Sequence, residues 1–249
     1  MAVLVVGNRL RPKTWEHASD EGAGPLALDL VKTFFVAVVA FVFVICWEQN
    51  QTAHDHTVDE AKGLVAAYQA VHSMPEPYRA INDRVRAYND EVRTDEWHVM
   101  ERDAALSEST GDMLNTLRAA VTAVRSEDAT VMEARAAALA ALDRVSEARQ
   151  DRALDAGGTL PTFLFITLVV GAILVLLDPV LSGTLVTMRS LAMTALLGVV
   201  VGLTVLAIHN VERPYSGVLG VSTDAFDYAD AEFQRISAGI ASVEAVSHR

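Results

Sequence analysis

Three long apolar segments dominate the pattern of hydrophobic and polar positions along the chain. The first, Leu26–Trp47, is interrupted by only three polar residues, and the other two, Leu160–Leu177 and Leu191–Ile208, contain no charged residue. A helix needs about 20 residues to cross the hydrocarbon core of a bilayer, so each segment is close to or above that length. The pattern therefore predicts an integral membrane protein with three transmembrane helices.

Between the first and second segments the pattern becomes amphipathic. Apolar residues recur at steps of three and four in four stretches, which begin near His54, Tyr78, Met113 and Val131. Pro75 and Pro77 end the first stretch, and the pair Gly157–Gly158 ends the last. The apolar stripes are narrow, which favours long antiparallel helical hairpins that pack on each other or on neighbouring subunits.

These patterns predict an all-α membrane protein in which a long extramembrane antiparallel helical region separates the first and second transmembrane helices. We divide the chain into an N-terminal segment 1–25, a transmembrane helix 26–47, a helical domain 48–159, a transmembrane helix 160–177, a short turn 178–190, a transmembrane helix 191–209 and an amphipathic tail 210–249. In the tail, helical spacing relates Val221, Ala225, Tyr228 and Ala229, and also Phe233, Ile236 and Ile240.

The first apolar segment could instead be a signal peptide, because Arg9, Arg11 and Lys13 precede it. Its apolar core is too long for that interpretation, and it ends at Trp47 without a small-residue cleavage site. We therefore interpret it as an uncleaved helix.

The amino-acid composition argues against several classes of protein. The 249 residues are 51% hydrophobic and carry a net charge of −12, and the region Glu48–Asp155 alone has 21 acidic against 12 basic residues. This acidic balance argues against a nucleic-acid partner, which needs clustered Lys and Arg. The single cysteine, Cys46, excludes an internal disulfide framework and a cysteine-rich zinc site.

The basic residues do not decide the orientation in the membrane. Arg9, Arg11, Lys13 and Lys32 would hold the N-terminus inside, whereas Arg144, Arg149 and Arg152 would hold the central region inside. Long segments also count poorly under the positive-inside rule. Charge alone leaves both orientations open.

Two groups of charged residues invite a chemical interpretation. His54, Asp55 and His56, with Asp59 and Glu60 nearby, resemble a metal site, but two His residues two positions apart on a helix point ~200° apart. We interpret them as the polar start of a helix and predict no metal or cofactor. Since neither a catalytic triad nor a phosphate-binding loop is recognisable, we predict that the protein is not an enzyme.

The first apolar segment contains a second group, Asp29 and Lys32. Three positions apart, they can pair on one helix face. Intramembrane charges are functional candidates by default. Because both lie near the membrane end of the segment, the simpler interpretation is that they reach towards the interface.

The segment Pro214–Gly217, after the third apolar run, contains residues that favour a turn. Pro214 prevents the helix from continuing, and Gly217 permits a left-handed turn. Tyr215 between them has a ring suited to the headgroup region and a hydroxyl that needs a partner. The segment is therefore either an ordinary helix end or a structural motif.

Three motifs in this order resemble the bestrophin-like family of bacterial integral membrane proteins. The first is the pair Glu60–Ala61, which opens a helix after the first span. The second is Tyr88, Val92, Glu96–Trp97 and Met100, which matches the family pattern Tyr-x3-Val-x3-Glu-Trp. The third, Pro214–Gly217 with its flanks, is similar to the family pattern Asp-x-Pro-Phe-x-Gly. Tyr215 stands where the family usually has Phe, and Glu212 where it usually has Asp.

The resemblance implies a channel-like architecture with a cytosolic helical domain, assembled as a ring. It makes Glu60, Tyr88, Glu96, Trp97, Pro214, Tyr215 and Gly217 candidate structural residues. Bestrophins proper are pentameric chloride channels with four spans, and some are gated by calcium; this sequence has no matching acidic calcium-binding loop. The additional N-terminal span of relatives is reduced here to Met1–Val6. Its loss would place the central domain and the C-terminus in the cytoplasm of a multi-pass protein of the bacterial inner membrane.

Two functional hypotheses follow. The first is a homo-oligomeric, channel-like protein of the lipid bilayer that passes small ions, with a narrow pore lined by Thr162, Thr167, Thr194 and Thr204. The acidic central domain counts against selectivity for anions. The second is a membrane-anchored helical sensor or scaffold without transport activity, which an external central domain would favour.

Overall fold

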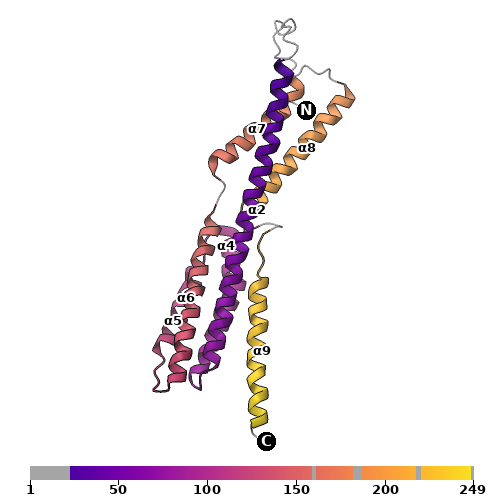
Figure 1. Cartoon of the computed structure of the whole chain (residues 1–249). Helices are drawn as coiled ribbons and strands as arrows, with labels where there is room; N and C mark the ends of the chain where they lie inside the picture. The colour runs from indigo at the N-terminus through magenta and orange to yellow at the C-terminus, as the bar shows by residue number, and fades with distance from the viewer. Residues whose placement is uncertain (1–22, 159–160, 182–186, 217–219, 248–249) are drawn as a thin grey trace. The chain divides into compact units, whose positions relative to one another are not determined.

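The computed structural model describes residues 23–158, 161–181, 187–216 and 220–247, and within them it is helical with no strand (Figure 1). The predicted all-α class is confirmed. The run Met1–Val6 and Gly217 lie outside the described residues. The chain forms two compact units: an apolar unit, Met1–Glu48 with Thr159–Glu212, and a polar unit, Gln49–Gly158 with Arg213–Arg249.

Helix α2 (Ala23–His72) contributes to both units and is the longest described helix, with 50 residues. The sequence pattern suggested separate helices at 26–47 and from His54, but the structure joins them, because residues 48–53 contain neither Gly nor Pro. The helix ends at His72, before Pro75 and Pro77, as predicted. At Gly63 a Cβ atom would lie 2.7 Å from Cγ2 of Val145, so this glycine lets α2 and α6 approach closely.

Besides the second part of α2, the polar unit contains helical elements of the central region and of the tail. They are the 3₁₀ turn η2 (Tyr78–Ala80), α3 (Ile81–Glu91), the π-helical turn η3 (Val92–Glu96), α4 (Trp97–Asp103), α5 (Glu108–Ala123), α6 (Ala129–Gly157) and α9 (Asp224–Ser247). The carboxylate of Asp128 caps α6 by accepting a hydrogen bond of 2.8 Å from the backbone N–H of Thr130.

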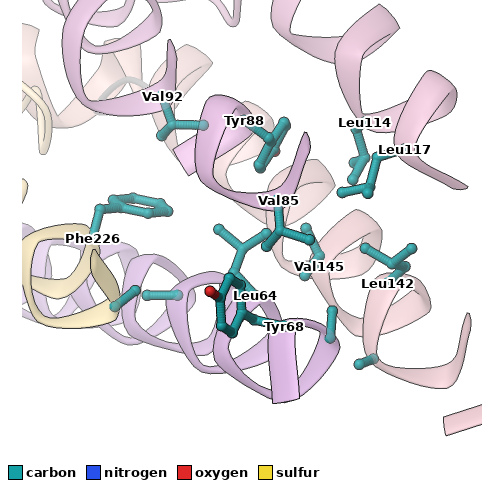
Figure 2. Close-up of a cluster of buried hydrophobic side chains, with 14 of the residues drawn as sticks. Leu64, Tyr68, Val85, Tyr88, Val92, Leu114, Leu117, Leu142, Val145 and Phe226 are labelled. Atoms are coloured by element: carbon teal, nitrogen blue, oxygen red, sulfur yellow. The ribbon is translucent and has the colours of Figure 1, made fainter. Parts of the chain in front are cut away.

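The core of the polar unit is one apolar cluster that every long helix of the unit supplies (Figure 2). The cluster includes Leu64 of α2, Val85 of α3, Leu117 of α5, Val145 of α6 and Phe226 of α9, all essentially buried. The tail helix α9 therefore packs on the central helices of its own chain. Of the tail residues related by helical spacing, Val221 and Ala229 are buried, whereas Tyr228 is 61% exposed; Phe226, which is not in that set, is fully buried.

The apolar unit consists of the first part of α2 with α7 (Thr162–Leu181) and α8 (Met188–Val211). Three described helical stretches, within Asp29–His72, Ala129–Asp178 and Leu191–Ile208, are long and apolar enough to cross a membrane. Close packing again depends on glycine: a Cβ at Gly171 would meet the ring of Phe35 at 2.5 Å.

The two units differ in the surfaces they expose. Among the described residues, all but two of the exposed large hydrophobic side chains lie in the apolar unit, and the exceptions are Leu154 and Tyr228. Soluble proteins rarely expose large contiguous apolar surfaces. The surface of the apolar unit is therefore typical of helices that lie against lipid or against other subunits.

Candidate functional site

Four charged side chains lie buried together in the polar unit and form what we call the charge cluster: Glu60, Glu96, Arg149 and Arg152. Glu60 comes from α2, Glu96 from η3, and both arginines from α6. The side chains of Glu60, Glu96 and Arg152 are 0% exposed. Charged residues are almost never fully buried unless they are paired.

The cluster is internally paired. Nε of Arg152 donates to Oε2 of Glu60 at 2.6 Å, and Nη2 of the same guanidinium donates to Oε1 of Glu96 at 2.7 Å. Arg149 also donates to Glu96, at 2.6 Å, and to the backbone carbonyl of Ser107, at 2.8 Å. Two carboxylates face two guanidinium groups, so the cluster has no excess formal charge, and Arg152 links α2 to η3 through α6.

Tyr88 completes the cluster on the side of α3. Its hydroxyl donates to Oε1 of Glu60 at 2.6 Å. Burial raises the pKa of Tyr88 well above its usual value, and the charge of Glu60 adds to the rise, so the hydroxyl stays protonated and remains a donor. Burial also raises the pKa of Glu60, although the charge of Arg152 and the Tyr88 hydrogen bond oppose that rise. Burial opposes the charge on Arg152, but Glu60 and Glu96 outweigh it and raise the pKa of Arg152.

The π-helical turn η3 explains how two consecutive residues can both point inward. A regular helix would turn Trp97 away from the side that carries Val92, and the wider turn of η3 changes that register. Val92, Glu96, Trp97 and Met100 are all buried. The turn therefore places a charged and an aromatic side chain in the same interior.

Aromatic rings pack beside the charge cluster. The ring of Trp97 meets the ring of Tyr215 edge-on, with 5.5 Å between centroids, and the ring of Phe226 at 6.3 Å. The guanidinium of Arg152 lies 5.3 Å from the centroid of Phe226. The hydroxyl of Tyr215 donates to the backbone carbonyl of Ala53 at 3.2 Å, and burial raises its pKa. The segment after α8 is thus held against α2 and α4.

The structure brings five of the candidate residues together from distant parts of the sequence: Glu60, Tyr88, Glu96, Trp97 and Tyr215. The neighbouring Pro214 is also buried. Its carbonyl accepts a hydrogen bond of 2.7 Å from the backbone N–H of Val221.

The threonines considered as pore-lining residues lie apart from this cluster, in the apolar unit. Thr162 is exposed at the start of α7, and Thr194 of α8 is half-buried. Thr167 donates to the carbonyl of Phe163 at 2.7 Å, and Thr204 donates to that of Val200 at 2.9 Å. Both hydroxyls therefore satisfy their donors within their own helices.

The sequence argument missed the two arginines of the cluster, which it used only for orientation. The sequence does contain a signal for their burial. The apolar stripe of α6 passes through Leu142 and Val145, and further steps of four and three residues lead to Arg149 and Arg152. Arginines on a buried stripe require acidic partners. Glu60 and Glu96 were the acidic residues already singled out.

Two further charged groups have specific partners. Nζ of Lys32 lies 2.8 Å from Oδ2 of Asp178 in α7 and 3.8 Å from Oδ1 of Asp29, so the expected pair exists but the shorter contact is with another helix. Nδ1 of His56 lies 2.7 Å from Oδ2 of Asp155. In the described part of the chain, no group of three or more His, Cys, Asp and Glu residues is arranged to hold a metal ion.

The geometry of the charge cluster indicates a structural task. Its carboxylates are enclosed and occupied by guanidinium and hydroxyl donors, which leaves no free base or nucleophile at a surface. What the cluster can do is fix the positions of α2, α3, η3 and α6 within the polar unit. The desolvation of buried charges largely offsets their mutual attraction, so such a cluster adds little net stability even though it links the helices.

Comparison with known proteins gives the family. The model of the bestrophin-like domain matches residues 1–226, which is most of the chain. The chain belongs to the bestrophin-like family. The structure of this bestrophin-like chain is similar to a crystal structure of a bacterial bestrophin homolog from Klebsiella pneumoniae with a leucine-to-threonine mutation. The TM-score is 0.63 at 12% sequence identity, over 85% of this chain and 87% of the other.

At that identity the likeness to the Klebsiella protein concerns the fold alone. No curated protein matches the sequence of this chain. The bestrophin-like family is an ion-channel-like family of membrane proteins.

Proposed function

We propose that this bestrophin-like chain assembles as a homo-oligomer in a lipid bilayer and forms a channel for small ions. The family match over residues 1–226 carries the proposal. A shared fold with a bacterial bestrophin homolog supports it. Three apolar helices per chain are too few to enclose a pore, so a channel requires several subunits.

In this proposal the segments 26–47, 160–177 and 191–209 cross the bacterial inner membrane. The surface of the apolar unit supports this placement, because Phe34, Phe41, Phe163 and Leu203 are among its many exposed apolar side chains. The region 48–159 forms the antiparallel helical domain on the cytoplasmic side, together with the C-terminal tail. The turn 178–190 then lies outside.

The pore of the proposed oligomer is narrow and mostly apolar. Thr162, Thr167, Thr194 and Thr204 are its candidate polar residues, and their number suits a constriction that controls flow by dewetting. The donors of Thr167 and Thr204 are used within their helices, so each would offer a passing ion mainly an acceptor oxygen.

The proposal is tested by the mass of the purified protein and by ion flux. We expect light scattering in detergent to give a multiple of the 26.8 kDa chain mass. We also expect vesicles reconstituted with the protein to release trapped salt faster than empty vesicles. The variant Arg152→Met, which weakens the charge cluster, should release the salt more slowly than the wild type. A strict monomer, or flux no faster than in empty vesicles, would contradict the channel.

The alternative is a membrane-anchored sensor or scaffold without transport activity. The acidic excess of the central region would repel anions from a cytoplasmic mouth and counts against anion selectivity, not against a channel as such. A stable oligomer without flux, whose central domain lies outside the cell, would favour this alternative.

A further inference from the structure

An apolar groove lies on the surface of the polar unit, between α2 and α9. It has a volume of about 450 Å³, and Lys62, Gln69 and Glu232 are the polar residues at its edge. A concave apolar surface with a polar rim is typical of a contact site for another protein. The apolar lining consists of Val58, Ala61, Val65 and Ala66 from α2, with Ala225 and Tyr228 from α9.

The polar unit also carries an apolar projection, Leu154, near the end of α6. Its side chain is 75% exposed, and besides Tyr228 it is the only exposed large hydrophobic residue among the described residues of this unit. Leu154 lies two positions after the buried Arg152, so it points about 200° away from it around the helix. The projection therefore faces out of the interior.

The projection and the groove lie on opposite faces of α2. Gly63 of α2 faces α6, because a Cβ atom there would lie 2.7 Å from Cγ2 of Val145, whereas Val65 lines the groove. Two positions apart on a helix, these residues point about 200° apart. One copy of the chain cannot place its Leu154 in its own groove, but it can place it in the groove of another copy.

The projection and the groove also lie at the same level along α2. Nδ1 of His56 in α2 lies 2.7 Å from Oδ2 of Asp155, the residue after Leu154. Val58, at one end of the groove, is two residues further along α2, which is a rise of about 3 Å. Copies that form a ring in one membrane share one orientation, so residues that meet must lie at the same level, and these do.

Charged residues beside the projection and the groove are complementary. Glu147 lies two helical turns before Leu154 on the same face of α6, is exposed, and has no ion-pair partner in the described part of the chain. Lys62, at the groove, has a 71% exposed side chain. Since the neighbouring Gly63 packs on Val145, Lys62 and Glu147 lie at similar levels. A lysine in one copy can therefore face a glutamate of the next.

We propose that Leu154 of one copy fills the groove between α2 and α9 of the next copy. Repeated head to tail, this contact joins different surfaces of successive copies and closes the polar units into a ring. The proposal rests on the proposed function, which requires several subunits, and it names the surfaces that meet. A stable interface buries about 800 Å² on each partner, so the exposed surface of the apolar unit supplies much of the remaining area.

The first test is disulfide cross-linking in vesicles, in a Cys46→Ala background with copper phenanthroline as oxidant. The double variant Leu154→Cys with Tyr228→Cys should give a ladder of dimers, trimers and larger products on a non-reducing gel. Neither single variant should cross-link, because the contact joins two different surfaces. Ala153→Cys with Tyr228→Cys is the matched control: Ala153 is also exposed but points about 100° away, so cross-linking should fall at least about fivefold.

The second test measures the strength of assembly. Leu154→Glu would place a charge in the apolar groove, so the protein concentration at which half of the oligomer dissociates in detergent should rise at least about tenfold. Ala153→Glu adds the same charge one residue earlier and should leave this concentration unchanged. Because both side chains are exposed, both variants should keep the thermal unfolding midpoint of the wild type. Light scattering and circular dichroism give the two quantities.

The outcomes separate this proposal from the proposed function. A ladder in a protein that does not conduct would support the ring of polar units and contradict the channel. A conducting oligomer that neither cross-links nor responds to Leu154→Glu would overturn the contact and leave the channel standing. Dimers formed by Tyr228→Cys alone would also overturn the contact, because two grooves would then face each other. A strict monomer would overturn both proposals.

Discussion

At the residue scale, Arg152 is the centre of the polar unit. Its guanidinium holds Glu60 and Glu96 at once and lies against the ring of Phe226. These partners come from three elements that are far apart in the sequence: α2, η3 and α9. Without the arginine, Glu60 would keep only its hydrogen bond from Tyr88, Glu96 would keep only Arg149, and the ring of Phe226 would lose its cationic neighbour.

We predict that Arg152→Met lowers the free energy of unfolding by about 3–5 kcal/mol, because it leaves two buried carboxylates without their shared partner. The control is Arg118→Met, which removes an exposed ion pair with Asp143 and should cost less than about 1 kcal/mol. Denaturant titrations of both variants in detergent measure the difference. Equal stability of the two would mean that the buried pair contributes nothing beyond a surface pair.

A second prediction concerns Tyr215, which stands where the resemblance gives Phe. Tyr215→Phe should cost about 1 kcal/mol or less, since it removes one hydrogen bond to Ala53 and keeps the contact with Trp97. Tyr215→Ala should cost about 3–5 kcal/mol, because it empties the space that the ring fills. Thermal unfolding midpoints distinguish the two. A large loss for the Phe variant would show that the hydroxyl matters more than the ring.

At the element scale, η3 is the irregular element that brings the motifs together. The π-helical turn places Glu96 and Trp97 in the same interior, and Tyr215, after α8, and Phe226, in α9, both contact the ring of Trp97.

We predict that Gly220→Ala destabilises the segment between α8 and α9 by about 1–3 kcal/mol through overpacking. A Cβ at position 220 would lie 3.0 Å from the carbonyl oxygen of Pro214 and 3.1 Å from that of Ser216, and backbone atoms cannot move aside as a side chain can. The exposed Ser222 provides the control: Ser222→Ala should change stability by less than about 0.5 kcal/mol. Limited proteolysis between α8 and α9, together with thermal unfolding, reads out the effect. Protection equal to the wild type in the glycine variant would show that this segment has room to relax.

At the scale of the whole molecule, the chain combines the apolar unit, which exposes many large apolar side chains, with the polar unit, which encloses the charge cluster. Helix α2 belongs to both. If the apolar unit spans the membrane as proposed, this continuous helix connects it directly to the polar unit. The side of the membrane on which the polar unit lies distinguishes the two functional hypotheses: a cytoplasmic polar unit favours the channel, and an external one favours the sensor.

We predict that the polar unit is cytoplasmic. In a Cys46→Ala background, Met188→Cys should react with an impermeant thiol reagent on intact cells, whereas Ser109→Cys should react only after the cells are opened. Both side chains are exposed in the structure, so a lack of reaction reflects the side of the membrane and not burial. The reverse labelling pattern would place the polar unit outside and favour the sensor.

Much of the fold followed from local patterns. The three apolar segments, the end of α2 before Pro75, and the amphipathic stretches of the central region were readable, because helix period, chain breakers and hydropathy act over a few residues. The motifs also singled out Glu60, Tyr88, Glu96, Trp97 and Tyr215, though as separate signals with no indication that they touch.

Only the tertiary structure decided which residues meet. The pairing of Arg152 with Glu60 and Glu96, the contact of Lys32 with Asp178, and the choice of Phe226 over Tyr228 depend on side chains brought together from distant helices. A local pattern gives the face on which a residue lies but not the partner opposite it. That partner is set by how the helices pack and by the need to satisfy each buried charge, which is a property of the whole interior and not of any one segment.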